Sequence, residues 1–276
     1  MTDPTGQTSD PASAGALFRA GRLDDAVAAA NAAVRKAPTD PGPRMLLAEL
    51  LLFQGNLERA DTLMDALTAM EPGLALQAAA FRQLVRAEQA RRQIWTEGRV
   101  PEFLGEPSPH LRRMLAALVT LRAGDAAEAM RLLDEAEANR PPAAGREGDV
   151  PFTDFRDADD LCSGFFEVLT TTGKCFWVPT ERVASVEFHA PERPRDLFWR
   201  RASMSVRDGP DGDVYIPAIY VGDQAGQPDP IRLGRATDWV GGEGAPMRGL
   251  GQRVFLVGDE GRGVMELTTL TFGAPS

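Results

Sequence analysis

The sequence predicts an α+β fold, with a solenoid of paired helices in the first half and a small antiparallel β-rich domain in the second. Up to about residue 140 the chain is rich in alanine and has apolar residues at helical spacing. Beyond residue 150, short β-branched and aromatic runs are broken by Gly, Pro and Asp. A linker rich in Pro, Ala and Gly spans 141–150. We expect a disordered N-terminus at 1–12, a helical repeat domain at 13–142 and a β-rich domain at 151–276.

The helical half contains a repeat that is visible in residue spacing. Gly21, Gly55 and Gly124 are each followed five positions later by alanine and seventeen positions later by proline, and each is preceded by alanine seven positions earlier. Helix–turn–helix units need glycine at the turn, small residues where the helices approach and proline after the second helix. Gly21 and Gly55 are 34 positions apart, and Gly124 lies 69 further on, so the period resembles that of tetratricopeptide repeats.

Three repeat units are predicted, at 14–38, 43–72 and 110–141. The helical segment 74–97 lacks the glycine turn and is either a degenerate repeat or one long helix, and 98–109 is predicted to be a loop. Such a solenoid either holds a helix of a partner in a groove or caps the second half. For a groove, the periodicity indicates a lining of Arg44, Leu47, Leu51, Arg113 and Thr120.

The second half is predicted to contain six or seven short strands, arranged as a small antiparallel sheet or a partly open barrel. The strand-like runs are 165–170 and 174–178 as a hairpin, then 183–188, 199–206, 214–221, and 253–257 with 264–272 as a closing hairpin around 258–263. Pro217 implies an edge strand or a bulge. The Gly- and Pro-rich segment 222–251 is predicted to be a long loop, which is usually functional or disordered.

Composition and charge exclude several classes of function. The net charge of −10 argues against binding to nucleic acid or to an anionic membrane. No apolar run reaches the roughly 18 residues of a transmembrane helix, and the N-terminus lacks the features of a signal peptide, so we expect a cytoplasmic protein. Cys162 and Cys175 have no paired spacing and are expected to be buried thiols. With two distant histidines besides, we expect neither a metal nor a cofactor.

An acidic cluster precedes the first predicted hairpin. Asp157, Asp159 and Asp160 could ligate Mg²⁺ or Ca²⁺, but the further oxygen ligands and the glycine of a calcium loop are missing. Such acids more often cap a short helix, here at 158–163, or pair with arginines. We therefore interpret them as a clamp where the solenoid meets the sheet.

A second polar cluster combines arginines with glycines. Arg232, Arg235 and Arg253, with the glycines at 249 and 251, could hold a phosphate, although no strand-to-helix phosphate motif is present. The alternative, which we prefer, is that these arginines pair inside the domain with the acidic cluster or with Asp238.

Catalysis is the second functional hypothesis. Glu167 and Asp238 are the best pair of carboxylates for acid–base hydrolysis, but nothing in the sequence places them at a suitable separation. No nucleophile elbow occurs, and Trp177, Trp199 and Trp239 are interpreted as core or interface aromatics. A hydrolase, or an enzyme that binds a metal or phosphate through the Asp/Arg cluster, is therefore the alternative to a binding protein. A structural homo-oligomer is a third possibility.

Several strings in the second half resemble one protein family. D-A-D-D-L, E-V-L-T-T-T-G-K-C-F-W-V-P, R-P-R-D-L-F-W-R, Y-I-P-A-I-Y, R-L-G-R-A-T-D-W and G-L-G-Q-R occur in this order between 151 and 272. Together they resemble the ImpE/SciE-type family, also called TagJ, of type VI secretion accessory proteins. The motif residues that we assign to the family architecture are Asp157, Asp159, Asp160, Glu167, Trp177, Pro179, Trp199, Arg232, Arg235, Asp238, Trp239 and Arg253.

The resemblance implies a non-enzymatic accessory protein of a bacterial contractile injection machine. It implies association with the small sheath subunit and, through that subunit, a link to recycling of the contracted sheath by a AAA+ ATPase. It supplies no catalytic residue and no cofactor. On this basis the stretch 156–179 is expected to be an architectural joint, with Glu167, Trp177 and Pro179 building the first hairpin, and no active site.

Overall fold

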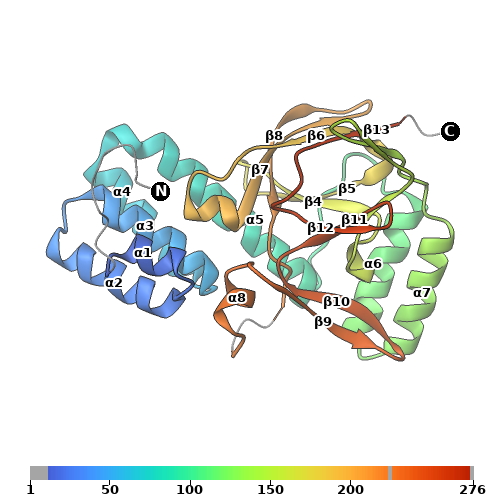
Figure 1. The fold of residues 1–276 in the computed structure, drawn as a ribbon, viewed down its shortest axis with the longest axis horizontal. Helices are drawn as coiled ribbons and strands as arrows, with labels where there is room; N and C mark the ends of the chain where they lie inside the picture. The colour runs from blue at the N-terminus through green and yellow to red at the C-terminus, as the bar shows by residue number, and fades with distance from the viewer. Residues whose placement is uncertain (1–11, 223–225, 274–276) are drawn as a thin grey trace.

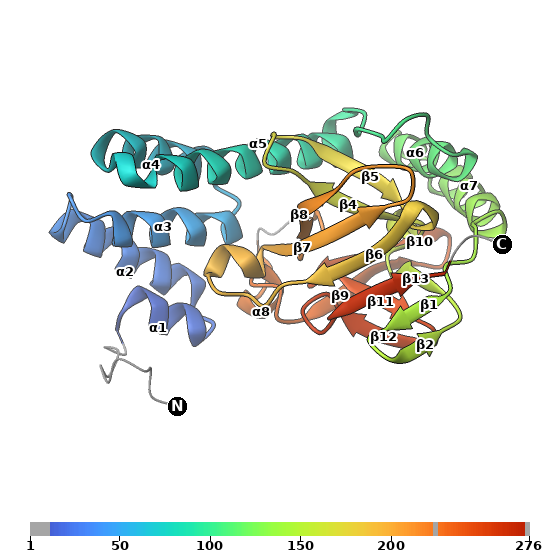
Figure 2. The same cartoon turned by 90° about the horizontal axis from the view of Figure 1, so that it is seen from above.

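A computed structural model describes residues 12–222 and 226–273. The predicted disorder of the N-terminus therefore falls almost entirely outside the described residues. Figures 1 and 2 show a stack of helices at one end, β-sheets in the middle and a helix pair at the far end. No helix in the described ranges combines the length and apolar character needed to cross a membrane.

The first four helices form in the predicted places, and three of them begin at a side-chain cap. They are α1 (Ala14–Arg19), α2 (Leu23–Lys36), α3 (Pro41–Phe53) and α4 (Leu57–Met70). The side chains of Ser13, Asp40 and Asn56 accept hydrogen bonds from the free backbone N–H groups at the starts of α1, α3 and α4. The turn residues Gly21 and Gly55 have φ of 79° and 75°, a conformation that favours glycine. The repeat alanines at 26, 48 and 60 are fully buried between helices, as predicted.

The segment after the second repeat is one long helix. After a short 3₁₀ turn, η1 (Pro72–Leu74), α5 runs from Ala75 to Glu97 and packs on α4. It ends at Gly98, which has a φ of 87°. Figure 2 shows α5 extending from the α1–α4 stack along the sheet towards the far helices. This helix therefore joins the helical and β-rich halves.

The third predicted repeat has the expected local form but another location. It consists of α6 (Pro109–Arg122) and α7 (Ala126–Ala138), which meet at Gly124 with a φ of 90°. The pair packs against the β-rich half, at the opposite end of the molecule from α1–α4 (Figure 2). The pair lies at this end because the long helix α5 carries the chain away from the first repeats. The loop after α5 then runs along the edge of the sheet, where Glu102 forms a bridge to Phe176.

The β-rich half consists of three antiparallel sheets and several short helical turns. The largest sheet has the strand order β2-β1-β13-β6-β7-β8-β4-β5, and two smaller sheets have the orders β12-β11-β3 and β10-β9. The strands are β1 (Gly145–Glu147), β2 (Val150–Phe152), β3 (Phe155–Asp157), β4 (Phe165–Leu169), β5 (Cys175–Pro179), β6 (Val183–Phe188), β7 (Trp199–Val206), β8 (Asp211–Pro217), β9 (Thr237–Gly242), β10 (Ala245–Gly251), β11 (Val254–Val257), β12 (Glu260–Gly263) and β13 (Thr269–Phe272). The helical turns are η2 (Asp160–Cys162), η3 (Thr180–Arg182), η4 (Pro194–Leu197) and α8 (Asp229–Arg232).

The large sheet has apolar cores on both faces, and β4 shows this most clearly. Phe165 and Leu169 belong to one core together with the helices, whereas Phe166 and Val168 belong to the other core. On that second face the ring of Phe155, from the three-stranded sheet, lies 5.4 Å from the ring of Phe166. Side chains alternate between the two faces of a strand, and both faces of β4 are covered by a core, so every residue of β4 is buried. The intervening residue, Glu167, faces the same side as Phe165 and Leu169, where α5 lies.

Several strand predictions are confirmed and others are wrong. The hairpin of β4 and β5 was predicted, and β6 and β7 have the predicted bounds. Pro217 does not mark an edge strand, because it is the last residue of β8, which lies inside the sheet between β7 and β4. The segment 222–251 is no long loop, since it includes α8, β9 and all of β10. The closing hairpin joins β11 to β12, and β13 pairs with β1 and β6.

Candidate functional site

A buried carboxylate lies where α5 meets the large sheet. Glu167 on β4 has no exposed surface. Its Oε1 accepts a hydrogen bond of 2.7 Å from the indole N–H of Trp95, and its Oε2 accepts one of 3.0 Å from Nε of Arg91. The guanidinium of Arg253 donates to the same Oε2 from the other side. One carboxylate thus ties α5 to two separate parts of the β-rich half.

Arg91 extends this network along α5 and to two further residues of the β-rich half. Its Nη2 donates to the backbone carbonyl of Ile219 at 3.0 Å, and its Nη1 lies 3.4 Å from the carboxylate of Glu88. Glu88 also accepts a hydrogen bond of 3.2 Å from the indole of Trp199. These residues form a charged layer inside an otherwise apolar interface, which requires nearly complete pairing to be stable.

Arg253 extends the network within the β-rich half. It is fully buried and donates to Asp157 at 3.0 Å as well as to Glu167. The other oxygen of Asp157 accepts from the hydroxyl of Tyr220 at 2.7 Å and from the backbone N–H of Asp159 at 2.9 Å. The expected pairing of Arg253 with the acidic cluster is therefore present, and Glu167 is an additional partner that the sequence did not indicate.

The two arginines determine the charge of Glu167. Burial by itself raises the pKa of this carboxyl, but the attraction of Arg91 and Arg253 and the hydrogen bonds it accepts outweigh burial and lower its pKa to about 2. Glu167 is therefore an anion at neutral pH. Because its side chain is inaccessible and its oxygens are occupied, its position favours structural pairing over acid–base chemistry.

The acidic cluster holds elements of the β-rich half together. Asp159 accepts from the backbone N–H groups of Leu161 and Gly249, both at 2.9 Å, and so caps η2 as predicted while it holds β10. Asp160 accepts from the N–H of Met247 at 2.7 Å. Within the described residues, no three His, Cys, Asp or Glu side chains gather as metal ligands. The clamp that we expected between solenoid and sheet is formed by Glu167, whereas these acids hold β10 and β11.

Arg232 and Arg235 form a second connection between the halves. We expected them to pair with the acidic cluster or with Asp238, which is wrong. Arg232 binds Asp24 on α2 at 3.0 Å and its neighbour Asp229 at 3.0 Å. Arg235 donates to the backbone carbonyls of Phe18 and Arg19 at the end of α1. The arginine motif therefore holds the first repeat and is not arranged as a phosphate site.

A third connection pairs Glu49 on α3 with Arg193, which precedes η4, at 2.7 Å. The Glu49 side chain is 3% exposed, whereas that of Arg193 is 33% exposed. Burial of the carboxyl outweighs the attraction of Arg193 and raises the pKa of Glu49 to about 7.

The remaining motif residues are divided between core and surface. Trp177 and Trp199 are buried, and the ring of Trp177 stacks on Phe165 at 4.1 Å. Pro179 ends β5 opposite Phe165. Trp239 is 38% exposed on β9, and the adjacent Asp238 accepts a hydrogen bond from its backbone N–H. The thiols of Cys162 and Cys175 are free and buried, as predicted.

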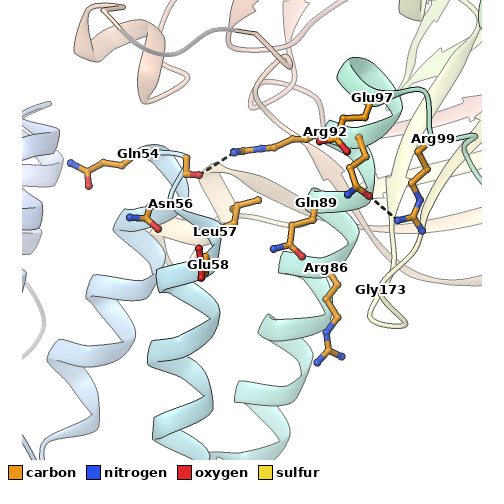
Figure 3. A pocket seen from close by; sticks show the side chains of 12 residues that line it. Gln54, Asn56, Leu57, Glu58, Arg86, Gln89, Arg92, Glu97, Arg99 and Gly173 are labelled. Carbon is orange, nitrogen blue, oxygen red and sulfur yellow. Dashed lines mark hydrogen bonds between the residues drawn. The ribbon is translucent and has the colours of Figure 1, made fainter. Parts of the chain in front are cut away.

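The structure also contains an open groove between the second repeat and α5. Its volume is about 960 Å³. Figure 3 shows side chains from the α3–α4 turn and the start of α4 on one side and side chains from α5 on the other. It is lined by Gln54, Gly55, Asn56, Leu57, Glu58, Arg86, Gln89, Arg92, Gln93, Glu97, Arg99 and Gly173. This lining is rich in amides and arginines.

The arginines of the groove differ in how they are held. Arg92 donates to the backbone carbonyl of Gly55 at 3.1 Å, and Arg99 donates to the amide oxygen of Gln93 at 3.1 Å (Figure 3). Within the described part of the chain, Arg86 makes no ion pair or hydrogen bond through its side chain. Arg86 and Arg99 are exposed and available to a partner.

The lining predicted from periodicity differs from this groove. Leu47 and Leu51 are 1% and 0% exposed in the helical core, so their assignment to an open surface is wrong. Arg44 lies on α3 and donates to the carbonyl of Pro38, whereas Arg113 and Thr120 lie on α6 at the far end of the molecule (Figure 1). The helix faces were misassigned because α3 is apolar on nearly all sides.

Sequence reasoning missed the charged residues on α5. Glu88, Arg91 and Trp95 follow one another at intervals of three and four, a spacing that places them on one helix face. That face also includes buried alanines at 87 and 90. Charged residues amid small apolar ones in a helix could have indicated a buried polar contact.

We predict that Glu167→Gln destabilises the protein by on the order of 3 to 5 kcal/mol at pH 7, because the charges of Arg91 and Arg253 would be left without their shared partner. Urea denaturation measures this, with the exposed Glu187→Gln as the control. Since the pKa of Glu167 falls from 4.5 to about 2 on folding, wild-type stability should decline from pH 4.5 to pH 2, and this decline should be smaller in the variant. Equal stability of the two variants would contradict the role of Glu167.

We predict the opposite pH dependence for Glu49. Its pKa rises from 4.5 to about 7 on folding, so its contribution is fully present below pH 4.5 and is lost as the pH rises through 7, by on the order of 3 kcal/mol. Wild type should therefore lose stability between pH 5 and pH 8, whereas Glu49→Gln should not lose this contribution. The free energy of unfolding of the variant minus that of wild type should increase from pH 5 to pH 8. Denaturant midpoints at the two pH values measure this, and an unchanged difference would show that Glu49 is ionised throughout.

Comparisons with known proteins agree with this architecture. A family model described as ImpE protein matches residues 149–271, and a tetratricopeptide-repeat model matches residues 17–85. A crystal structure of a Vibrio parahaemolyticus protein superimposes with a TM-score of 0.87 at 26% identity, covering 94% of this chain and 97% of that one.

A relative from Pseudomonas aeruginosa, described as type VI secretion system accessory component TagJ, is 30% identical over 256 residues. The match covers 93% of this chain and 89% of that protein, so it includes both the helical and the β-rich halves. The chain therefore belongs to the ImpE/SciE-type family, also called TagJ.

Proposed function

We propose that this chain is a non-enzymatic accessory protein of a bacterial type VI secretion system. In this proposal it binds a helical segment of the small sheath subunit and takes part in sheath assembly or recycling, with an indirect link to the AAA+ ATPase. The relationship to TagJ over 93% of the chain supports the choice of system. The groove beside α5 is the observation that carries the binding role, because it is a large concave surface made by repeat helices.

The chemistry of the groove is suited to a polar or amphipathic helix. Leu57 is an apolar residue in the lining, while Gln54, Gln89 and Gln93 offer both hydrogen-bond donors and acceptors. A helix that lies in such a groove contacts it through residues at i, i+3, i+4 and i+7. Arg86, whose side chain pairs with no other described residue, and the exposed Arg99 favour acidic side chains on the face of the bound helix.

The motif residues support a scaffold role better than a catalytic one. Glu167, Asp157 and Arg253 are buried, and Arg253 pairs with both carboxylates. Arg232 and Arg235 hold the first repeat. Glu167 and Asp238 do not form an acid–base pair open to a substrate, since Glu167 is inaccessible. No arrangement of the motif residues favours the alternative of a hydrolase.

The double variant R86E/R99E tests the groove. Reversing both charges should weaken binding to the purified small sheath subunit by at least about tenfold, since attraction is replaced by repulsion at two exposed positions. Isothermal titration calorimetry with full-length proteins measures the affinity. The control is R35E/R146E, which makes the same charge change at exposed positions on α2 and β1, outside the groove.

Two outcomes would contradict different parts of the proposal. If wild type does not bind the small sheath subunit, the proposed partner is wrong. If wild type binds and the groove and control variants bind equally well, the partner is right but the groove is not its site.

A further inference from the structure

A cleft of about 620 Å³ lies where the large sheet and the three-stranded sheet meet near their outermost strands. One wall is formed by β1 and β2 of the large sheet, and the other by the β11–β12 hairpin. Figure 2 shows these strands on the side of the molecule away from α5. We call this the sheet-edge cleft, and it is lined by residues 147, 150–153, 257–260, 262 and 268.

The strand register places charged and apolar side chains on the inner walls of the cleft. Glu147 lies opposite Val150 in the β1–β2 pair, and Phe152, two positions further on, belongs to the second apolar core. In the β11–β12 pair, Glu260 lies opposite Val257, which packs against the same core. Residues opposite one another in an antiparallel pair, and residues two apart along a strand, share a face. The side chains of both glutamates therefore point into the space between the two sheets.

The charge of this lining is acidic. Among the lining residues Arg262 is the one cation, and it pairs with Glu147 at 3.2 Å and with Glu266, beside the cleft, at 3.9 Å. Asp259 and Glu260 are exposed, and their side chains make no ion pair or hydrogen bond with any described residue. Two carboxylates of the cleft are therefore left without a counter-charge in the described part of the chain.

Glu147 is also incompletely bonded. Its side chain is 10% exposed, but within the described ranges it accepts no hydrogen bond and has only the ion pair with Arg262. A carboxylate that is removed from water needs several donors to offset the loss of hydration. A cationic group that enters the cleft would supply donors both to Glu147 on one wall and to Glu260 on the other.

The apolar part of the cleft is open to solvent at Val150. This residue is 69% exposed, whereas Phe152 on the same strand is 8% exposed. Val257, on the opposite wall, is half-buried. An apolar side chain that lies between the two valines would remove apolar surface of both from water. The cleft therefore combines an apolar contact with carboxylates that lack partners.

Several other occupants are disfavoured. The chain outside the described ranges, 1–11, 223–225 and 274–276, contains three aspartates and neither lysine nor arginine, so it does not supply the missing cation. A metal ion is disfavoured because no three His, Cys, Asp or Glu side chains gather as ligands in the part of the chain that is described. Anionic ligands would be repelled by Asp259 and Glu260. The charge of the cleft favours a cation from another molecule.

We propose that the sheet-edge cleft is a second protein-docking site, which binds a segment that carries an arginine next to an apolar side chain. Arginine suits the cleft because its planar guanidinium has five N–H donors, enough to bind carboxylates on both walls. The apolar neighbour packs between Val150 and Val257. The cleft shares no lining residue with the groove beside α5, so this proposal does not depend on the partner proposed for that groove.

NMR titration of the full-length protein with labelled methyl groups tests the chemistry of the occupant. Two short synthetic peptides carry a leucine between two positions that are arginine in one peptide and its neutral isostere citrulline in the other. The arginine peptide should shift the methyl resonances of Val150, Val257 and Thr268. It should bind at least about fivefold more tightly than the citrulline peptide, because only the arginine side chains carry a charge that the carboxylates attract.

A pair of charge-reversal variants tests the location. Glu260→Lys should weaken binding of the arginine peptide by about fivefold or more, because it places a cation where the guanidinium binds. The control is Asp211→Lys, which reverses another exposed acid at the start of a strand, β8, outside the cleft. Both positions are exposed, so both variants should match wild type in urea denaturation.

The proposal is wrong if the lining methyl resonances do not move at millimolar arginine peptide, or if the arginine and citrulline peptides bind equally well. Equal binding of the arginine peptide by the two lysine variants would contradict the location. If spermidine shifts the lining resonances and the arginine peptide does not, the cleft is a site for small polyamines. If sedimentation shows that wild type self-associates and that Glu260→Lys alone prevents this, the occupant is a second copy of the chain.

Discussion

The shared carboxylate of Glu167 is the interaction on which the rest of the structure depends. It is buried in the middle of β4 and accepts hydrogen bonds from Arg91 and Trp95 on α5 and from Arg253 beside β11. Two buried guanidinium groups would be very costly without this anion. The position of α5 on the sheet, and the approach of β11 to β4, are therefore linked through one side chain.

This link explains why the helical and β-rich halves are not independent lobes. The long helix α5 packs against α4 of the repeats and also against β4 and β5 of the large sheet. Arg232 and Arg235 add contacts to α1 and α2, and Glu49 pairs with Arg193 near η4. With α5 fixed in this way, the groove between the second repeat and α5 has a defined shape. That is a requirement for recognising one helical segment over others.

The sequence allowed the fold class and most of the helices to be predicted, because their signals are local. The glycines at 21, 55 and 124 indicate turns between helices, and this signal does not depend on where in the molecule those helices pack. The alternating strands β4 to β7 were also recognisable. In contrast, β9 and β10 contain several glycines, β9 is mostly exposed, and their pairing has an irregular register between Ala245 and Arg248, so they lack the clear alternation that identifies a strand.

The site was less predictable because it depends on contacts between residues far apart in the chain. Glu167 is 76 positions from Arg91 and 86 from Arg253, and no local pattern indicates such partners. The acidic cluster was recognised as a cap because capping is local, whereas its bonds to Met247 and Gly249 were not. For the same reason, the sequence indicated that a groove exists in the repeats but did not identify the residues that line it.

Native-state hydrogen exchange is the most direct measurement of the link between the two halves. If the network around Glu167 joins them, the slowest amides of α5 and β4 should open with the same free energy, equal to that of global unfolding. The opening free energies of these two sets of amides should also decrease together as denaturant is added. If the amides of α5 exchange through an opening of much lower free energy while β4 stays protected, the halves are separately stable and the central role of Glu167 is wrong.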